Sequence, residues 1–135
     1  MKKLVIISLF ILSICSCGKM PVNGKLDGMW QLMKIETRGS EYDMKESRLY
    51  YNVQLELLGL QSAGYVGILG RFIQTNDSLF VYDFRSSKDN AIPADYGQLA
   101  TFGIYNQQER FGIETLTHDK MVLRSATATL YFRKF

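Results

Sequence analysis

The feature that most constrains the fold is an alternation of apolar and polar residues at every second position. It is most regular over residues 49–58, LYYNVQLELL, where Tyr51, Val53 and Leu55 alternate with polar side chains. Successive side chains of a β-strand point to opposite faces of a sheet, so this spacing predicts a strand with one buried face. Residues 42–49 would form two helical turns at most. The pattern therefore predicts an all-β chain.

The same alternation recurs in seven other segments, separated by residues that are typical of turns, such as Gly59, Ala63-Gly64 and His118-Asp119. Several short strands at regular spacing predict an eight-stranded antiparallel up-and-down barrel, with a β-sandwich as the alternative. The predicted strands cover residues 29–38, 49–58, 65–74, 78–85, 98–105, 110–117, 120–125 and 127–133.

The N-terminal residues have the features of a secretory signal. Lys2 and Lys3 precede an apolar run at residues 4–12, and small residues follow it. A transmembrane helix requires roughly 20 apolar residues, so this run is too short to span a bilayer. We therefore predict that residues 1–16 form a signal peptide that is removed.

The segment Ile14-Cys15-Ser16-Cys17 resembles the lipobox of bacterial lipoproteins. This resemblance implies cleavage before Cys17 and attachment of acyl chains, such as palmitate, to that residue. Residues 17–25 would then form a lipid-anchored tether, and residues 26–135 the barrel domain. The alternative is an ordinary signal peptide with incidental cysteines.

Acylation of Cys17 would make the membrane a partner of the chain. Each buried methylene contributes about 0.8 kcal/mol, so two or three acyl chains would anchor it stably. In some lipoproteins an acidic cluster after the cysteine marks export to the cell surface, and none follows Cys17. We therefore expect the periplasmic face of an outer membrane, with the cell surface as the alternative.

The remaining composition argues against several classes of function. Both cysteines lie at the signal junction, and the single histidine, His118, falls in a predicted turn, so we expect no metal, cofactor or catalytic triad. Without residues 1–16, fourteen basic residues face thirteen acidic ones, which does not favour nucleic acid as a partner. We expect the chain not to be an enzyme.

Two segments resemble the lipocalin-like lipoproteins of Bacteroidetes. Gly28-Met29-Trp30 resembles the Gly-x-Trp start of lipocalins, and residues 113–133 resemble the last strands of the bacterial family. The resemblance implies that Trp30 closes one end of the barrel and that Arg133 or Lys134 lies across its ring. By loop parity, residues 39–48 would then lie at the open end and residues 86–97 at the closed end. If the second loop contained a ninth strand, this assignment would reverse for everything after it.

The inward face of the predicted barrel is the candidate binding surface. An eight-stranded barrel is just wide enough to be filled by side chains or to hold one small ligand. The first hypothesis is therefore an envelope lipoprotein that binds a small apolar or amphipathic ligand. The alternative is a solid-core module that contacts another envelope protein. The residues predicted to line a ligand are Tyr51, Val53, Leu55, Phe72, Phe80, Tyr82 and Phe111.

Overall fold

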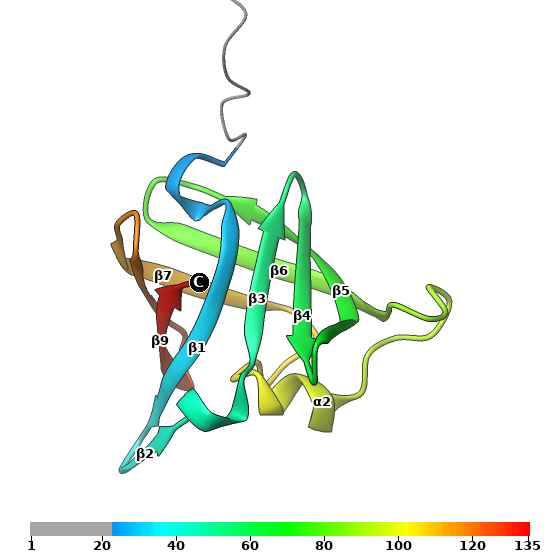
Figure 1. The fold of residues 1–135 in the computed structure, drawn as a ribbon, viewed down its shortest axis with the longest axis horizontal. Helices are drawn as coiled ribbons and strands as arrows, with labels where there is room; N and C mark the ends of the chain where they lie inside the picture. The colour runs from blue at the N-terminus through cyan, green and yellow to red at the C-terminus, as the bar shows by residue number, and fades with distance from the viewer. Residues whose placement is uncertain (1–22) are drawn as a thin grey trace, which may run out of the picture.

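The computed structural model describes residues 23–135, which form a single antiparallel sheet closed into a barrel (Figure 1). The predicted signal peptide, Cys17 and most of the predicted tether lie outside the described residues. No helix within residues 23–135 is both long enough and apolar enough to cross a bilayer. The strands are β1 (Gly28–Thr37), β2 (Ser40–Asp43), β3 (Tyr50–Gln54), β4 (Leu57–Ser62), β5 (Tyr65–Gln74), β6 (Ser78–Ser86), β7 (Glu109–Leu116), β8 (Lys120–Arg124) and β9 (Ala128–Lys134).

Pairing of the first and last strands closes the barrel. From β3 to β9 each strand pairs with the next along the chain, β1 pairs with β3, and β9 returns to pair with β1. The short strand β2 pairs only with the second half of β1 and lies outside the ring. The expected eight-stranded up-and-down barrel is therefore confirmed, with one additional strand.

The strand count agrees with the prediction because two differences compensate. Residues 49–58, predicted as one strand, form the β3–β4 hairpin, whose turn contains Leu55 at a φ of +55°. Residues 98–105, also predicted as a strand, instead begin within the short helix α2 (Tyr96–Thr101). Alternation continues through the β3–β4 turn because the two turn residues fit the same apolar–polar pattern, which is why the sequence does not reveal the break.

Splitting that predicted strand reverses the end at which the loops between β4 and α2 lie, and the loss of the strand predicted at residues 98–105 restores the order after α2. The end with Trp30, called here the Trp30 end, holds the 3₁₀ turn η1 (Gly24–Leu26) and the turns β3–β4, β5–β6 and β7–β8. The opposite end, called the α2 end, holds the other connections. Residues 86–97 therefore lie at the same end as residues 39–48, and the expected placement at the closed end is wrong (Figure 1).

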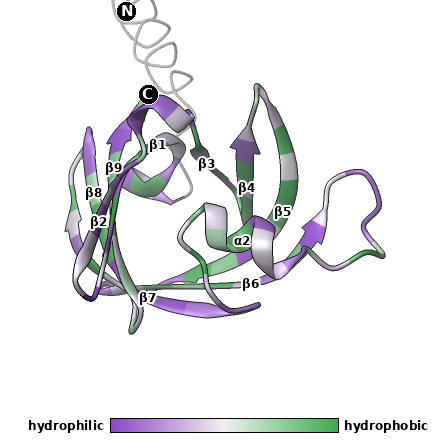
Figure 2. Cartoon of the chain, turned by 90° about the horizontal axis from the view of Figure 1, so that it is seen from below, coloured by the Kyte–Doolittle hydropathy of each residue, from purple (hydrophilic) through white to green (hydrophobic). Residues whose placement is uncertain are grey.

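The interior of the barrel contains one continuous apolar cluster drawn from all eight strands and from the α2 connection. Its largest fully buried side chains include Trp30, Tyr51, Phe84 and Phe111. Figure 2 shows α2 set against the mouth of the barrel rather than on its outer wall. The connection between β6 and β7 therefore contributes to the core.

Candidate functional site

Trp30 occupies one end of the barrel, as the sequence predicts. Its side chain is fully buried, and its indole Nε1–H donates a hydrogen bond to the carbonyl of Leu26 (2.8 Å), which fixes η1 across that end. The cation above its ring is the Nζ of Lys134, 4.7 Å from the ring centroid. That ammonium also donates to the carbonyls of Lys25 and Asp27.

The expectation that Arg133 serves as the barrel-end cation is therefore wrong. Phe132 is buried inside the barrel, so along β9 Arg133 points outward and Lys134 points inward again. The guanidinium of Arg133 accordingly donates to Oε1 of Gln31 on the outer wall (2.9 Å). Lys134, the other candidate named from the sequence, has the inward register.

Four of the seven predicted lining residues face the interior. Tyr51, Val53, Phe72 and Phe111 are all buried in the apolar cluster. Their contact with a ligand remains a prediction, because here they pack against one another and against their neighbours.

The other three predicted lining residues face outward, and their placement in the interior was wrong. Leu55 is 57% exposed in the β3–β4 turn. On β6 the inward positions are Leu79 and Val81, so Phe80 and Tyr82 alternate to the outer wall. There their rings stack with centroids 5.4 Å apart. Both faces of this strand carry apolar residues, so periodicity alone does not decide which face is buried.

The connection between β6 and β7, residues 87–108, closes the mouth of the barrel, and we call it the α2 plug. Leu99, Phe102 and Ile104 insert buried side chains into the interior. The hydroxyl of Tyr51 donates a hydrogen bond to the backbone carbonyl of Phe102, joining the plug to strand β3. Burial raises the pKa of the Tyr51 phenol well above its ordinary value, so the group remains a neutral donor. The plug is therefore held by packing and by a buried hydrogen bond.

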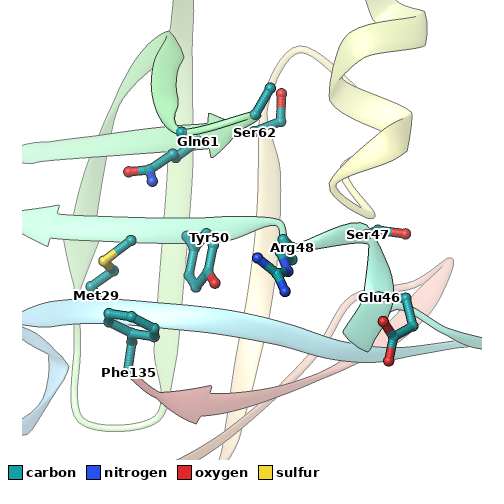
Figure 3. Close-up of a pocket in the computed structure, with 10 residues that line it drawn as sticks. Met29, Glu46, Ser47, Arg48, Tyr50, Gln61, Ser62 and Phe135 are labelled. Carbon is teal, nitrogen blue, oxygen red and sulfur yellow. The ribbon is translucent and has the colours of Figure 1, made fainter.

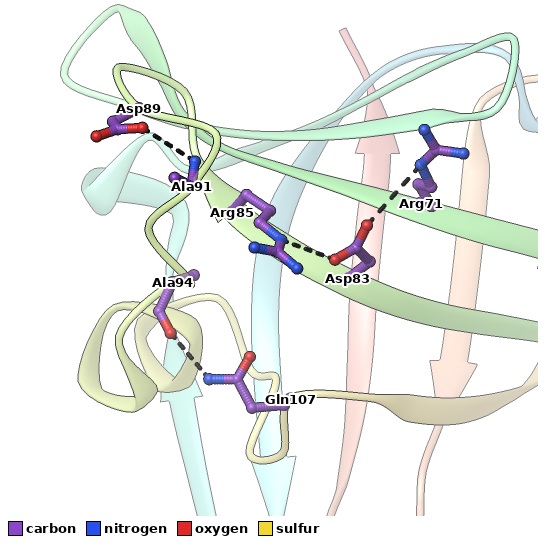
Figure 4. A network of polar contacts seen from close by, with 7 residues as sticks. All are labelled: Arg71, Asp83, Arg85, Asp89, Ala91, Ala94 and Gln107. Carbon is purple, nitrogen blue, oxygen red and sulfur yellow. Dashed lines mark hydrogen bonds and ion pairs between the residues drawn. The ribbon is translucent and has the colours of Figure 1, made fainter.

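One polar contact fixes the plug to the barrel wall, and another joins its two flanks (Figure 4 shows the second). The backbone N–H of Ala94 donates to the carbonyl of Phe84 on β6, and Nε2 of Gln107 donates to the carbonyl of Ala94 (both 2.9 Å). Nearby, the exposed carboxylate of Asp83 pairs with Arg85 at 2.8 Å. These contacts place the connection but do not form a catalytic arrangement.

A small cleft remains at the mouth, between the plug and strands β4 and β5. It has a volume of about 140 Å³ and reaches Leu60, Ile68 and Phe102. Sites for drug-sized ligands have volumes of about 300 to 1,000 Å³, so this cleft would hold a few waters or a small group only. Among residues 23–135, no three His, Cys, Asp or Glu side chains are grouped as they would be to ligate a metal ion.

A larger hollow of about 750 Å³ lies on the outer wall, across β1, β3 and β4 (Figure 3). Its apolar lining comes from Met29, Tyr50 and Phe135. The rings of Tyr50 and Phe135 meet edge to face, with centroids 5.4 Å apart, and the Phe135 N–H donates to the carbonyl of Met29 (2.8 Å). We refer to this feature as the outer hollow.

The polar lining of the outer hollow lies toward the α2 end. Arg48 ends the 3₁₀ turn η2 (Lys45–Ser47) with a φ of +51°, and none of the ion pairs within residues 23–135 involves it. In Figure 3 its guanidinium points toward Tyr50, whereas Glu46 lies further along the turn. Gln61 and Ser62 complete this side. The arrangement combines a cation with an adjoining aromatic surface.

The residues of the outer hollow are hard to recognise in the sequence. Tyr50 neighbours an inward residue on β3, and Phe135 follows the last strand, so neither belongs to the period-two pattern that marks the interior. The aromatic content near residues 42–51 was the one available signal. It predicts a rim of tyrosines near the mouth but not their pairing with the C-terminal residue.

Comparisons with known proteins agree with the barrel. The family model for the lipocalin-like domain matches residues 10–135. A lipocalin-like protein from Bacteroides uniformis superposes with a TM-score of 0.64 at 21% identity, covering 83% of this chain and all of that one. A protein from Bacteroides eggerthii superposes with a TM-score of 0.60 at 22% identity, covering 81% of this chain and 98% of that one. A search of curated proteins gives no match.

Proposed function

Because this chain belongs to the lipocalin-like domain family, we propose that it is a lipid-anchored envelope protein whose barrel binds a small amphipathic molecule. Residues 1–17 support the anchoring part through their export signal and lipobox-like segment. The outer membrane, on its periplasmic face, is the location we propose. The outer hollow is the observation that supports ligand binding.

The outer hollow suits a ligand with an apolar or aromatic body and an anionic group. Its volume of about 750 Å³ falls within the range of small-molecule sites, whereas the cleft at the mouth does not. Tyr50, Phe135 and Met29 offer the apolar surface, and Arg48 offers up to five N–H donors. The carboxylate of Glu46, at the edge of the hollow, would repel an anion that is bound away from Arg48.

Titration with the fluorescent anion 8-anilinonaphthalene-1-sulfonate tests this site in the purified barrel domain. Asparagine tolerates a positive φ, so Arg48→Asn removes the cation without adding strain. We expect binding about tenfold weaker, equivalent to about 1.4 kcal/mol. Arg38→Asn, in the exposed β1–β2 turn, is the matched control and should leave affinity unchanged. Equal affinities for all three proteins would refute the site.

Two further measurements address the native ligand and the anchor. Native mass spectrometry of protein extracted from its own host membranes should show a bound small molecule, which Arg48→Asn displaces. Cys17→Ala should remove the acyl mass and release a folded protein into the soluble fraction. A Cys17→Ala protein that still sediments with membranes would contradict acyl anchoring.

The filled interior favours a second candidate function, a solid-core module that contacts another envelope protein. The inward aromatic and aliphatic side chains, together with the α2 plug, leave the outer wall as the surface available for contact. Crosslinking in intact cells from a position in the outer hollow distinguishes the two. A fixed protein adduct would favour the module, and a small-molecule adduct would favour ligand binding.

A further inference from the structure

The start of the described chain is fixed to one corner of the Trp30 end. The Asn23 side-chain amide donates to the carbonyl of Leu55 in the β3–β4 turn (2.8 Å) and to Oδ1 of Asp27 (2.6 Å). Its backbone N–H donates to Oδ2 of Asp27 (3.1 Å). These contacts hold the point from which the upstream residues depart directly beside the β3–β4 turn.

The number of residues between this point and Cys17 sets a short reach. Residues 18–22 separate Cys17 from Asn23, and an extended chain spans at most about 3.5 Å per residue. The α-carbon of Cys17 therefore lies within about 21 Å of the α-carbon of Asn23, whatever the conformation between them. If Cys17 carries acyl chains, as proposed above, the Trp30 end must lie close to the bilayer.

Three exposed aliphatic side chains lie at the tips of the strands at this same end. Leu55, Leu57 and Ile73 are 57%, 44% and 54% exposed, and we call them the aliphatic rim. Leu57 pairs with Arg71 on the neighbouring strand, and Ile73 follows two residues later, so Leu57 and Ile73 share the outward face. Leu55 adopts a φ of +55°, where Asn or Gly would be less strained.

The charges at this end point to a neutral lipid surface rather than an anionic one. Four basic residues lie near the turns of the Trp30 end: Lys25, Arg71, Lys120 and Arg133. Four acidic residues, Asp27, Glu56, Asp77 and Asp119, lie there as well, and Arg71 is 4.0 Å from the carboxylate of Asp83. The Lys134 ammonium is engaged over Trp30 and with backbone carbonyls. A basic face of the kind that binds anionic lipid is therefore absent from this end of residues 23–135.

We propose that the aliphatic rim inserts into the interface of the zwitterionic lipid bilayer to which Cys17 is anchored. The barrel then stands on its Trp30 end, with α2 directed away from the membrane (Figure 1). Arg48, which follows η2 and precedes β3, lies on the side directed away from the membrane as well. This orientation rests on the proposed acylation of Cys17. It leaves the polar side of the outer hollow open to molecules arriving from the aqueous phase.

Site-specific fluorescence in the acylated protein tests the orientation. The mature chain has no free thiol once Cys17 is acylated, so Leu55→Cys introduces one labelling site for a nitrobenzoxadiazole dye. Ala126→Cys, exposed in the β8–β9 turn at the α2 end, is the matched control. Both proteins are purified from host membranes, their acyl mass is verified, and they are reconstituted in phosphatidylcholine vesicles containing a doxyl-labelled lipid quencher.

We expect the dye at position 55 to emit at a shorter wavelength and to be quenched by the doxyl lipid, while the dye at position 126 remains aqueous and unquenched. Ile73→Cys should behave like Leu55→Cys, which guards against a local effect of one label. Adding phosphatidylglycerol or salt should change neither result.

Three outcomes would overturn the proposal, and each has a different signature. An acylated protein that floats with vesicles while both rim labels remain aqueous refutes the rim contact but leaves acyl anchoring intact. Quenching that appears only with phosphatidylglycerol shows a contact driven by charge. The absence of acyl mass on Cys17 refutes the anchor itself, and the orientation with it.

Discussion

Replacing Tyr51 by Phe tests whether the plug is held in the barrel as the structure indicates. Tyr51 is 1% exposed, and its ring packs against Phe132 and Phe102, with centroids 4.7 and 6.2 Å away. The substitution keeps that ring and removes only the hydroxyl that donates to the Phe102 carbonyl. The change therefore isolates one buried hydrogen bond between strand β3 and the plug.

The expected cost follows from the environment of the two groups. A neutral hydrogen bond contributes about 0.5–1.5 kcal/mol net, but leaving a buried acceptor unpaired costs about 1–3 kcal/mol. No other hydrogen bond to the Phe102 carbonyl is made within the described residues. We therefore expect the free energy of unfolding to fall by about 2 kcal/mol. At roughly 4 °C per kcal/mol for a domain of this size, Tm should fall by about 8 °C.

Urea unfolding followed by circular dichroism measures this loss. The slope of the free energy of unfolding against urea concentration should be unchanged, provided that the folded and unfolded states keep their compactness. Tyr50→Phe is the matched control, because Tyr50 lines the outer hollow and is only partly buried. Amide hydrogen exchange should also quicken over residues 99–104 in Tyr51→Phe alone. If Tyr51→Phe loses no more stability than Tyr50→Phe, the hydrogen bond does not hold the plug.

Two other substitutions test the packing at opposite ends of the barrel. Gly103→Ala should lower the free energy of unfolding by about 2 kcal/mol or more, the cost of overpacking combined with backbone strain. A Cβ at this position would lie 2.5 Å from Cδ2 of Leu130, and the residue has a φ of +82°. Gly39→Ala has a similar φ of +89° but open space, so the difference in Tm between the variants measures the clash. Lys134→Met should lose about 1–2 kcal/mol and shift the fluorescence of Trp30, since it removes the cation over the ring and two hydrogen bonds. A thermal melt and an emission spectrum unchanged from wild type would contradict the assigned role.

The strands were predictable where one face is apolar and the other polar. Strand β5 spans the residues predicted for it, and β1, β6, β7, β8 and β9 differ by one residue at one or both ends. The prediction failed where a turn preserves the alternation. Leu55 and Glu56 continue the apolar–polar order through the β3–β4 turn, so nothing in the pattern marks the reversal of the chain.

The candidate site was less predictable than the fold because it depends on which elements meet in space. Residues 98–105 are apolar at enough alternate positions to resemble a strand, yet they fill the mouth of the barrel as a helix and a turn. The local pattern indicates that such a segment is buried, but it does not indicate which elements the segment packs against. The pairing of Tyr50 with Phe135 likewise follows from the register of β9 on β1, which the sequence does not specify.

Energetic considerations favour the outer hollow over the interior as the proposed binding site. A ligand inside the barrel would have to displace Leu99, Phe102 and Ile104, all buried, at about 1.5–3 kcal/mol for each exposed side chain. The sum, about 5–9 kcal/mol, is comparable to the whole stability of a small domain. Such a ligand would need correspondingly more interaction energy to bind at all. The outer hollow requires no such rearrangement, because its lining is already accessible, so a ligand there would not have to offset that cost.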